Sequence, residues 1–567
     1  MLGGMKAVLF LIVAAIIVGA IWFAPAETPA APGEAAASAA PVVPADALTI
    51  RIVYGSEKQA WLEAVTTDFN ARRVQVAGKP VHVETVAKGS GELIDDVLAG
   101  RDQADLVSPA SAAFITLANA QSRAATGADL VSKTENVVLS PVVIAMWKPM
   151  AEALGWPRER IGWGDILALA QQPQGWASKG QPQWGRFRFG HTHPEFSNSG
   201  LQTLLAEVYA GAGKQGGLTV ADVQAPAVAP FVQGIERAVV HYGSSTGFFA
   251  KRMFAGGPGY LSAAVLYENL VIEANSADPK PSFPVVAIYP KEGTFWSDHP
   301  TGIVERPWVT SERRLAAQAY LKFLMERPQQ EAAMRFGFRP AAVEVAVAAP
   351  IDAAHGADPK EPSTTLETPS AEVIAASIAL WRSAKKPAHV ALVLDTSGSM
   401  EEDGKIAAAR DGATEFLGLL NPGDRLSLMT FSSTPQWLGQ NLPLASAKAQ
   451  SIAQVGGLIA SGKTALNDAV LQAFTALQAD PDQGAIKAIV VLSDGADTTS
   501  TTTLETLLTR IDPGPESGGA IRVFTIAYGK DAAGEVLKRI AETTQAKAYK
   551  GGTGDIRLVF RDIATFF

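Results

Sequence analysis

The chain has 567 residues, more than one hydrophobic core supports, so its length predicts roughly two to four domains. Hydrophobic residues make up 47% and charged residues 18%, which excludes global disorder, a collagen-like repeat and a protein with many membrane spans. The formal net charge is −8 and no long basic run is present, which argues against a nucleic-acid partner. The absence of cysteine excludes disulfides, thiolate metal sites and a cysteine nucleophile.

The N-terminus carries an uninterrupted apolar run over residues 7–23, preceded by Lys6. A run of this length matches a membrane-spanning helix better than the shorter core of a secretory signal. Residues 24–26 (APA) resemble a cleavage site, so an anchored and a cleaved, secreted form both stay open. Lys6 favours the cytoplasmic side, so everything downstream crosses the membrane. We expect residues 1–24 to be a single-pass signal anchor of the inner membrane, with periplasmic domains.

Two stretches of irregular composition divide the rest of the chain. Residues 25–47 are nearly all Ala and Pro, which is typical of an extended spacer, and residues 346–384 contain several prolines and mixed charges. These stretches predict two major domains, at 48–345 and 385–567. Strand and helix patterns alternate in both domains, which predicts an α/β fold class with parallel sheets.

The first domain repeats a strand, a Gly/Ser loop and a helix at residues 48–56, 81–100 and 104–111. A long apolar strand follows at 136–149, then GHTHPEFSNSG at 190–200 before a helix, and a returning strand at 285–300 before the last helices. This order of motifs resembles the type 2 periplasmic solute-binding proteins of nutrient transporters. The resemblance implies two lobes that clamp a small ligand between them.

Polar side chains at the carboxyl ends of these strands are the candidates for a ligand cleft. A helix N-terminus after residues 197–200 favours anions, although Ser and Asn at this position also act as simple caps. We expect a small polar or anionic ligand. The candidate residues are Ser56, Ser90, Ser108, Ser197, Ser199, Tyr260 and Glu268. His191 and His193 have the spacing of two metal ligands on one strand, but no third ligand pairs with them by spacing, so polar loop or cleft contacts are favoured.

The second domain begins with HVALVLDTSGSM at 389–400, a buried-type strand that ends in acidic and hydroxyl side chains. With a threonine before a later helix and an aspartate after a later strand, this region resembles the von Willebrand factor type A (VWA) domain, a doubly wound Rossmann-like fold. In that family the corresponding positions form a metal-ion-dependent adhesion site. These positions are Asp395, Ser397, Ser399, Thr464 and Asp494. Three hydroxyls and two carboxylates suit Mg²⁺ or another divalent cation.

The family resemblance implies that Ser397, Ser399 and Thr464 coordinate the ion directly, while Asp395 and Asp494 act mainly through waters. An open coordination position then accepts a carboxylate from a protein partner. This is a binding mechanism and requires no catalytic residue.

A competing motif overlaps the same region, because residues 457–464 (GLIASGKT) match the phosphate-loop pattern GxxxxGK[ST]. That pattern has meaning only where a strand enters the loop, and the alanine-rich segment at 444–457 has helical periodicity. An ATPase is therefore a minor alternative. We expect a non-enzymatic extracytoplasmic protein that combines ligand capture with Mg²⁺-dependent protein binding. The main alternative is a solute receptor of an ABC-type transporter whose VWA domain is a docking module.

Overall fold

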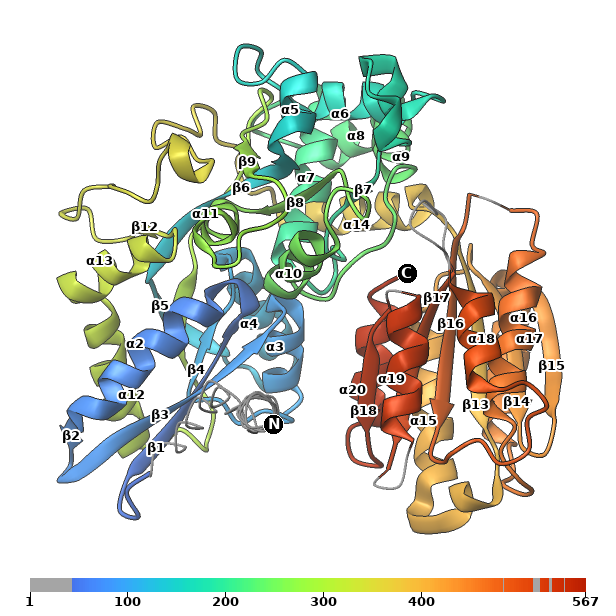
Figure 1. Ribbon diagram of the computed structural model, residues 1–567. Helices are drawn as coiled ribbons and strands as arrows, with labels where there is room; N and C mark the ends of the chain where they lie inside the picture. The colour runs from blue at the N-terminus through green and yellow to red at the C-terminus, as the bar shows by residue number, and fades with distance from the viewer. Residues whose placement is uncertain (1–42, 483, 513–520, 530–532, 545) are drawn as a thin grey trace, which may run out of the picture. The chain divides into compact units, whose positions relative to one another are not determined.

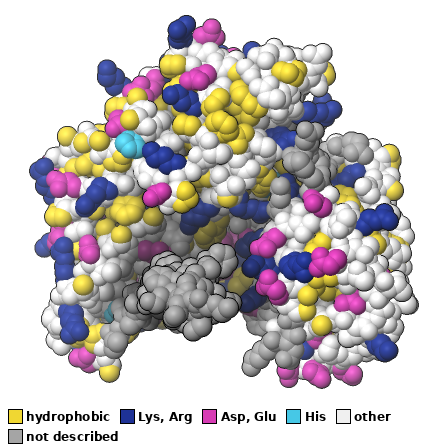
Figure 2. Space-filling model, viewed as in Figure 1, with side chains coloured by type: hydrophobic (Ala, Val, Ile, Leu, Met, Phe, Trp, Pro, Cys, Tyr) yellow, Lys and Arg dark blue, Asp and Glu magenta, His cyan; other side chains and the backbone are white. Residues whose placement is uncertain are grey.

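The computed structural model describes residues 43–567 except 483, 513–520, 530–532 and 545. The expected signal anchor at residues 1–24 lies outside this range, as does most of the Ala/Pro spacer. No helix within the described residues is long and apolar enough to cross a membrane. Residues from Leu48 to Phe567 form one compact unit of three six-stranded sheets and their helices. Figure 2 shows acidic and basic side chains interspersed on the visible face.

The first sheet belongs to lobe 1 of the first domain and has the order β2-β3-β1-β4-β11-β5 (Figure 1). Its strands are β1 (Leu48–Gly55), β2 (Gln75–Val76), β3 (Lys79–Lys88), β4 (Leu106–Ser108), β5 (Val131–Asn136) and β11 (Pro300–Val304). Its helices are α2 (Gln59–Arg72), α3 (Ser90–Leu98), α4 (Ala112–Thr126), α12 (Ser311–Leu324) and α13 (Arg327–Arg335). β1 pairs in parallel with β3 and β4, so the carboxyl ends of these three strands meet at one edge.

Lobe 1 is covered on both faces because alternate residues of β1 point in opposite directions. Ile50 and Ile52 belong to the hydrophobic cluster that includes Trp61 of α2 and Tyr320 of α12. Val53 belongs instead to the cluster that includes residues of α3 and α4. Burial on both faces explains the nearly continuous apolar run of this strand.

Lobe 2 is built around β6 (Val138–Trp147), the long crossing strand, in a sheet of order β10-β6-β8-β7 with β9 and β12 also paired to β6. Its other strands are β7 (Phe189–Gly190), β8 (Ala263–Tyr267), β9 (Val285–Ile288), β10 (Trp296–Ser297) and β12 (Arg339–Pro340). Its helices are α5 (Lys148–Ala153), α6 (Trp163–Ala170), α7 (Asn198–Ala212), α8 (Val220–Val223), α9 (Val228–Glu236), α10 (Thr246–Gly256) and α11 (Glu268–Ser276). The chain passes between the lobes at β5–β6 and again at β10–β11.

The stretch between the two domains contains more regular structure than its composition indicates. A short 3-10 helix, η4 (Ala353–His355), is followed by α14 (Ala371–Ala384), which begins after the N-cap Ser370. The Ser370 hydroxyl accepts a hydrogen bond from the Val373 amide, the usual reason for a helix to start at serine. Trp381 of α14 is fully buried. The other short 3-10 helices are η1 (Ser56–Lys58), η2 (Gly175–Lys179), η3 (Pro182–Trp184) and η5 (Gly398–Gly404).

The second domain has one sheet of order β15-β14-β13-β16-β17-β18, parallel except for the edge strand β15. Its strands are β13 (Ala388–Asp395), β14 (Arg425–Phe431), β15 (Pro435–Pro443), β16 (Ile486–Ser493), β17 (Arg522–Tyr528) and β18 (Ala548–Gly551). Its helices are α15 (Lys405–Leu419), α16 (Leu444–Gly456), α17 (Leu466–Gln478), α18 (Leu504–Ile511), α19 (Gly534–Thr543) and α20 (Ile556–Ala564). Val390 and Leu392 of β13 pack in a cluster with α15 and α20, whereas Ala391 and Val393 pack with α17 and α19. Helices therefore cover both faces, as expected for a doubly wound sheet.

Candidate functional site

The five predicted metal-site residues lie at the carboxyl edge of the VWA sheet. Asp395 is the last residue of β13, and Ser397 and Ser399 lie in the turn that leads into α15. Asp494 directly follows β16, which is the parallel neighbour of β13. Thr464 lies two residues before α17. Neighbouring parallel strands end side by side, and this brings residues from three distant parts of the sequence together.

Side-chain distances show that four of these residues surround one small space. The Ser397 and Ser399 hydroxyl oxygens are 3.1 Å apart, and the Ser399 hydroxyl donates to Oδ1 of Asp494 at 2.8 Å. A Cβ on Gly495 would lie 3.9 Å from both the Ser399 and the Thr464 hydroxyl oxygens. The hydroxyls and Asp494 therefore form a set of hard oxygen donors that suits Mg²⁺.

Both carboxylate oxygens of Asp395 are already hydrogen bonded, so this residue supports the oxygen donors indirectly. Its Oδ1 accepts the Ser397 amide at 2.8 Å, and its Oδ2 accepts the Ser493 hydroxyl at 2.6 Å. Burial is the main cause of a raised pKa at Asp395, and the nearby Asp494 carboxylate raises it further. A nearby cation would relieve both effects, because it favours the charged form of a carboxyl. Bonded on both oxygens, Asp395 fits a role through bridging waters.

Two further side chains contact the metal-site residues and were missed by the sequence analysis. Lys405, the first residue of α15, donates from Nζ to Oδ2 of Asp494 at 2.8 Å. Ser493 holds Asp395, as described above. Ser493 directly precedes Asp494, a predicted site residue, and this position in the sequence could have indicated it. Lys405 reaches Asp494 because η5 turns the chain back toward the site. The spacing of residues along the sequence does not predict this turn.

The structure contradicts the phosphate-loop alternative. The segment that enters residues 457–464 is α16, and β15 ends before that helix. A phosphate loop requires a strand that leads directly into the loop. Thr464 instead faces Ser399, and its amide is hydrogen bonded to the Thr498 hydroxyl.

The two lobes of the first domain approach each other closely around the predicted cleft. A Cβ on Gly91 of lobe 1 would lie 2.8 Å from the Glu195 carbonyl oxygen of lobe 2, and one on Gly247 would lie 2.5 Å from the Ser56 carbonyl oxygen. Only glycine permits this approach. The Gly247 amide donates to the Ser56 hydroxyl at 3.1 Å across the same contact. Beside it opens a pocket of about 470 Å³, lined by residues of η1, α10 and α11.

Five of the seven predicted cleft residues lie at this boundary, and each has a hydrogen-bond partner. Ser56 bonds Ser245 of the other lobe at 2.9 Å, and Ser108 accepts from Thr301 at 2.8 Å. Of the other three serines, Ser90 accepts from the Ala110 amide, Ser197 bonds Thr246, and Ser199 bonds both Thr192 and Thr246. Ser197 is the residue before α7 and Ser90 begins α3, so two helix N-termini face the boundary.

The other two predicted residues are not brought to this cluster. The Glu268 carboxylate forms a buried ion pair with Arg339 at 2.7 Å and accepts the Tyr289 hydroxyl. The Tyr260 hydroxyl bonds to His241. Both side chains are buried within lobe 2, Glu268 at the start of α11 and Tyr260 in the turn before β8, and spacing along the sequence does not reveal this direction.

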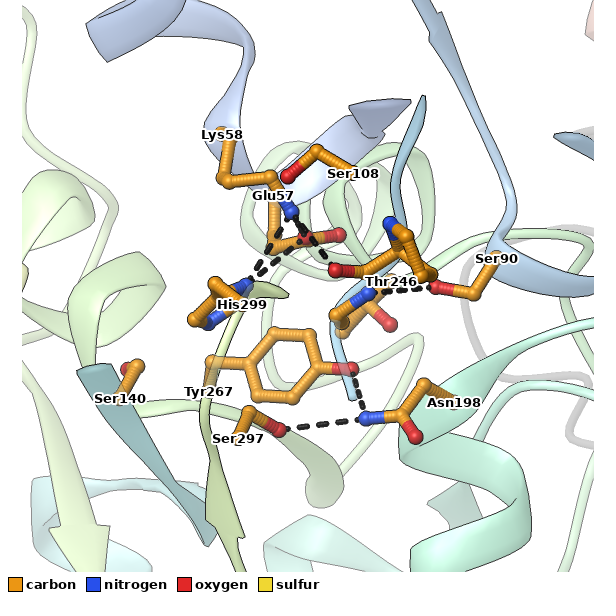
Figure 3. Close-up of polar contacts among 12 residues, drawn as sticks. Glu57, Lys58, Ser90, Ser108, Ser140, Asn198, Thr246, Tyr267, Ser297 and His299 are labelled. Carbon is orange, nitrogen blue, oxygen red and sulfur yellow. Dashed lines mark hydrogen bonds and ion pairs between the residues drawn. The ribbon is translucent and has the colours of Figure 1, made fainter. Parts of the chain in front are cut away.

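Three buried ionisable side chains, Glu57, Lys58 and His299, lie close together beside the cleft serines (Figure 3). Lys58 and Glu57 of η1 form an ion pair of 2.7 Å, and the Lys58 Nζ lies 3.2 Å from Nδ1 of His299. Burial alone would raise the pKa of Glu57, but the Lys58 charge and a hydrogen bond with His299 outweigh it and lower the pKa to about 2. Burial and the Lys58 charge lower the pKa of His299 to about 4, so this ring is neutral at pH 7.

Two buried polar atoms of the cleft have no hydrogen-bond partner within the described residues: Asn198 Oδ1 and His299 Nε2. Asn198, the first residue of α7, donates from Nδ2 to the hydroxyls of Tyr267 and Ser297 at 3.0 and 3.2 Å (Figure 3). The other ring nitrogen of His299, Nδ1, lies 3.2 Å from the Lys58 Nζ and 3.4 Å from Oε1 of Glu57, so it already has polar partners. Asn198 Oδ1 and His299 Nε2 are thus left without one among the described residues, and such buried polar atoms are uncommon unless a ligand or water meets them.

Two family models match parts of this chain. The family model described as a bacterial extracellular solute-binding protein matches residues 50–339, and that of the von Willebrand factor type A domain matches residues 390–496. Two uncharacterised proteins of Mycobacterium tuberculosis strains are 22% identical over 286 residues, which is 48% of this chain. The chain matches only 39% of the length of these relatives.

Three solved structures are similar in fold. A periplasmic thiamin binding protein is 14% identical, with a TM-score of 0.43, over 59% of this chain and 96% of its own. The sulfate-binding protein SubI from Mycobacterium tuberculosis is 22% identical, with a TM-score of 0.36, over 53% and 88%. A von Willebrand factor type A protein from Catenulispora acidiphila is 23% identical, with a TM-score of 0.28, over 32% and 42%. The chain belongs to the bacterial extracellular solute-binding proteins, and it carries a VWA domain after its solute-binding domain.

Proposed function

We propose that this chain is a non-enzymatic binding protein that captures a small solute in its first domain and binds a protein partner through a divalent cation in its second. The observation that carries the proposal is the convergence of three hydroxyls and Asp494 on one space, with Asp395 held behind them. Both domain families generally bind rather than catalyse, which supports the same assignment.

Ser397, Ser399 and Thr464 would hold Mg²⁺ directly. Asp395 and Asp494, each hydrogen bonded on both carboxylate oxygens, would act mainly through waters. The cation supplies a Lewis-acidic position for a carboxylate of the partner. The protein donors are too few to fill six coordination positions, so a partner oxygen completes the set. Lys405 neutralises one oxygen of Asp494, which limits the negative charge at the site and makes an added carboxylate more acceptable.

The unpartnered buried atoms Asn198 Oδ1 and His299 Nε2 support the binding of a small polar or anionic solute between the lobes. The start of α7 in the cleft favours negative charge on that solute. We further propose that residues 1–24 anchor the chain in the inner membrane, or direct it to the periplasm if they are cleaved, so that both domains are extracytoplasmic.

The test is thermal unfolding of the full-length chain with Mg²⁺ or EDTA, comparing Asp395→Asn with Glu402→Gln. Both variants lose one negative charge, but Glu402 lies seven residues later in η5, is exposed, and has no side-chain hydrogen bond to the described residues of the site. A ligand of the native state stabilises it by about 2.7 kcal/mol at a hundred times its Kd. Mg²⁺ should raise the VWA unfolding temperature of wild type and Glu402→Gln only. An equal response from all three proteins would refute the metal site.

The second candidate function is a solute receptor that docks on an ABC-type permease through the VWA domain. The membership of the solute-binding family favours it. The two functions differ in whether partner binding depends on the cation. Partner binding that persists in EDTA supports docking and excludes the metal-dependent contact.

A further inference from the structure

Lobe 2 contains a cluster of ionisable side chains that belongs to neither the cleft nor the VWA metal site. His191 follows β7, Glu207 lies within α7, and Glu236 is the last residue of α9. All three side chains are 0% exposed, and one potential ligand atom from each lies within 4.8 Å of the other two. Burial of three ionisable groups together is costly unless they share a compensating charge.

The hydrogen bonds of His191 leave one ring nitrogen facing a carboxylate. Nδ1 lies 2.8 Å from the Thr192 carbonyl oxygen, which only accepts, so Nδ1 carries a proton. In a neutral ring Nε2 is then an acceptor, and it lies 3.0 Å from Oε1 of Glu236. Two acceptors at this distance repel each other unless a positive charge joins them.

Glu207 makes the charge imbalance larger. Neither of its carboxyl oxygens has a hydrogen-bond partner within the described residues, although both are buried. The other oxygen of Glu236, Oε2, accepts the Tyr242 hydroxyl at 2.6 Å. One cation, or a proton shared between the two carboxyls, would supply the missing positive charge.

We propose that His191, Glu207 and Glu236 bind one divalent transition-metal ion, such as Zn²⁺ or Mn²⁺. An imidazole nitrogen with carboxylate oxygens is a common donor set for these ions. A ligating histidine usually donates its other N–H to a carbonyl or carboxylate, and His191 does so to Thr192. Tyr242 supports Glu236 in the same manner. The ion would fasten α7 and α9 to the end of β7, and α7 also presents Asn198 to the cleft.

The experiment measures bound metal in the full-length chain carrying Asp395→Ala, which removes a key residue of the VWA site. The protein is stripped with a chelator, incubated with Zn²⁺ or Mn²⁺, freed of unbound ion and analysed for metal content. Glu207→Gln and Glu236→Gln remove one ligand charge each at nearly constant shape, and the exposed lobe 2 residue Glu159 provides the control Glu159→Gln. Tyr242→Phe removes only the outer hydrogen bond.

One metal equivalent is expected in the Asp395→Ala parent and in Glu159→Gln. Tyr242→Phe should weaken binding about 10- to 100-fold, as outer-shell changes do, and the two ligand variants by more than that. X-ray absorption of the Zn²⁺-loaded parent should show a single imidazole in the first shell, a readout that needs no variant to fold. A parent that binds neither ion would overturn the proposal in favour of a shared proton, and retention of metal by Glu207→Gln would also overturn it.

Discussion

Replacement of Lys58 by methionine tests whether the buried charges of the cleft are tightly coupled. Methionine has about the same length as lysine and fills the space without charge. Lys58 and Glu57 are 2.7 Å apart and both nearly fully buried. At an effective dielectric constant of about 20, a pair at that distance attracts by about 6 kcal/mol, which is offset in part by the cost of desolvating two ions. Removal of one partner from a buried pair typically costs about 3–5 kcal/mol.

We therefore expect Lys58→Met to lower the free energy of unfolding of the solute-binding domain by about 3–5 kcal/mol at pH 7. Without the ammonium, burial raises the pKa of Glu57 above its unfolded value. The deficit should then shrink as the pH falls toward 5, because the folded state takes up a proton first. Urea unfolding followed by tryptophan fluorescence measures the effect, since buried Trp61 lies one turn after Lys58 in the chain.

The double variant Glu57→Gln/Lys58→Met is the matched control. It removes both charges, so it should recover most of the lost stability and give a large coupling free energy in the double-mutant cycle. If Lys58→Met costs less than about 1 kcal/mol, the pair behaves as an exposed ion pair, and the argument from burial is wrong. Additive losses in the double variant would refute the coupling in the same way.

Two further predictions concern the same cleft. The pKa of His299 is about 4 in the folded chain, against an ordinary value of 6.5 in the unfolded chain. The unfolded chain therefore binds more protons between these pH values, and the free energy of unfolding should fall by about 3 kcal/mol from pH 6.5 to 4 through this group. His299→Gln should remove that part of the slope in pH-dependent urea unfolding, whereas His82→Gln, at a half-buried position of β3, should keep it. Asn198→Asp places a negative charge at the start of α7 without a change of shape, so calorimetric titration should show weaker binding of the probe ion sulfate. Sulfate binding that is equal in wild type and variant would contradict an anion site at α7.

The metal-site prediction from sequence was specific because its residues occur in a short ordered pattern. Asp395, Ser397 and Ser399 lie within five positions after a buried strand, and strand ends in a parallel sheet face one edge. Local sequence therefore sufficed to predict β13 and the doubly wound sheet, whereas the two lobes of the first domain were expected from the family resemblance. Hydrophobic periodicity predicted the order of strands and helices but not the long-range pairing of β11 with β4 or of β12 with β6.

The tertiary structure alone decided which polar side chains share a space. Glu57 and Lys58 read from sequence as ordinary charged residues at a helix start, yet they are buried because His299, more than 200 positions later, closes over them. Glu207 and Glu236 meet His191 only through the packing of α7 and α9. Secondary structure follows from local periodicity and capping, whereas the partner of a buried charge depends on long-range packing, which spacing along one chain does not encode.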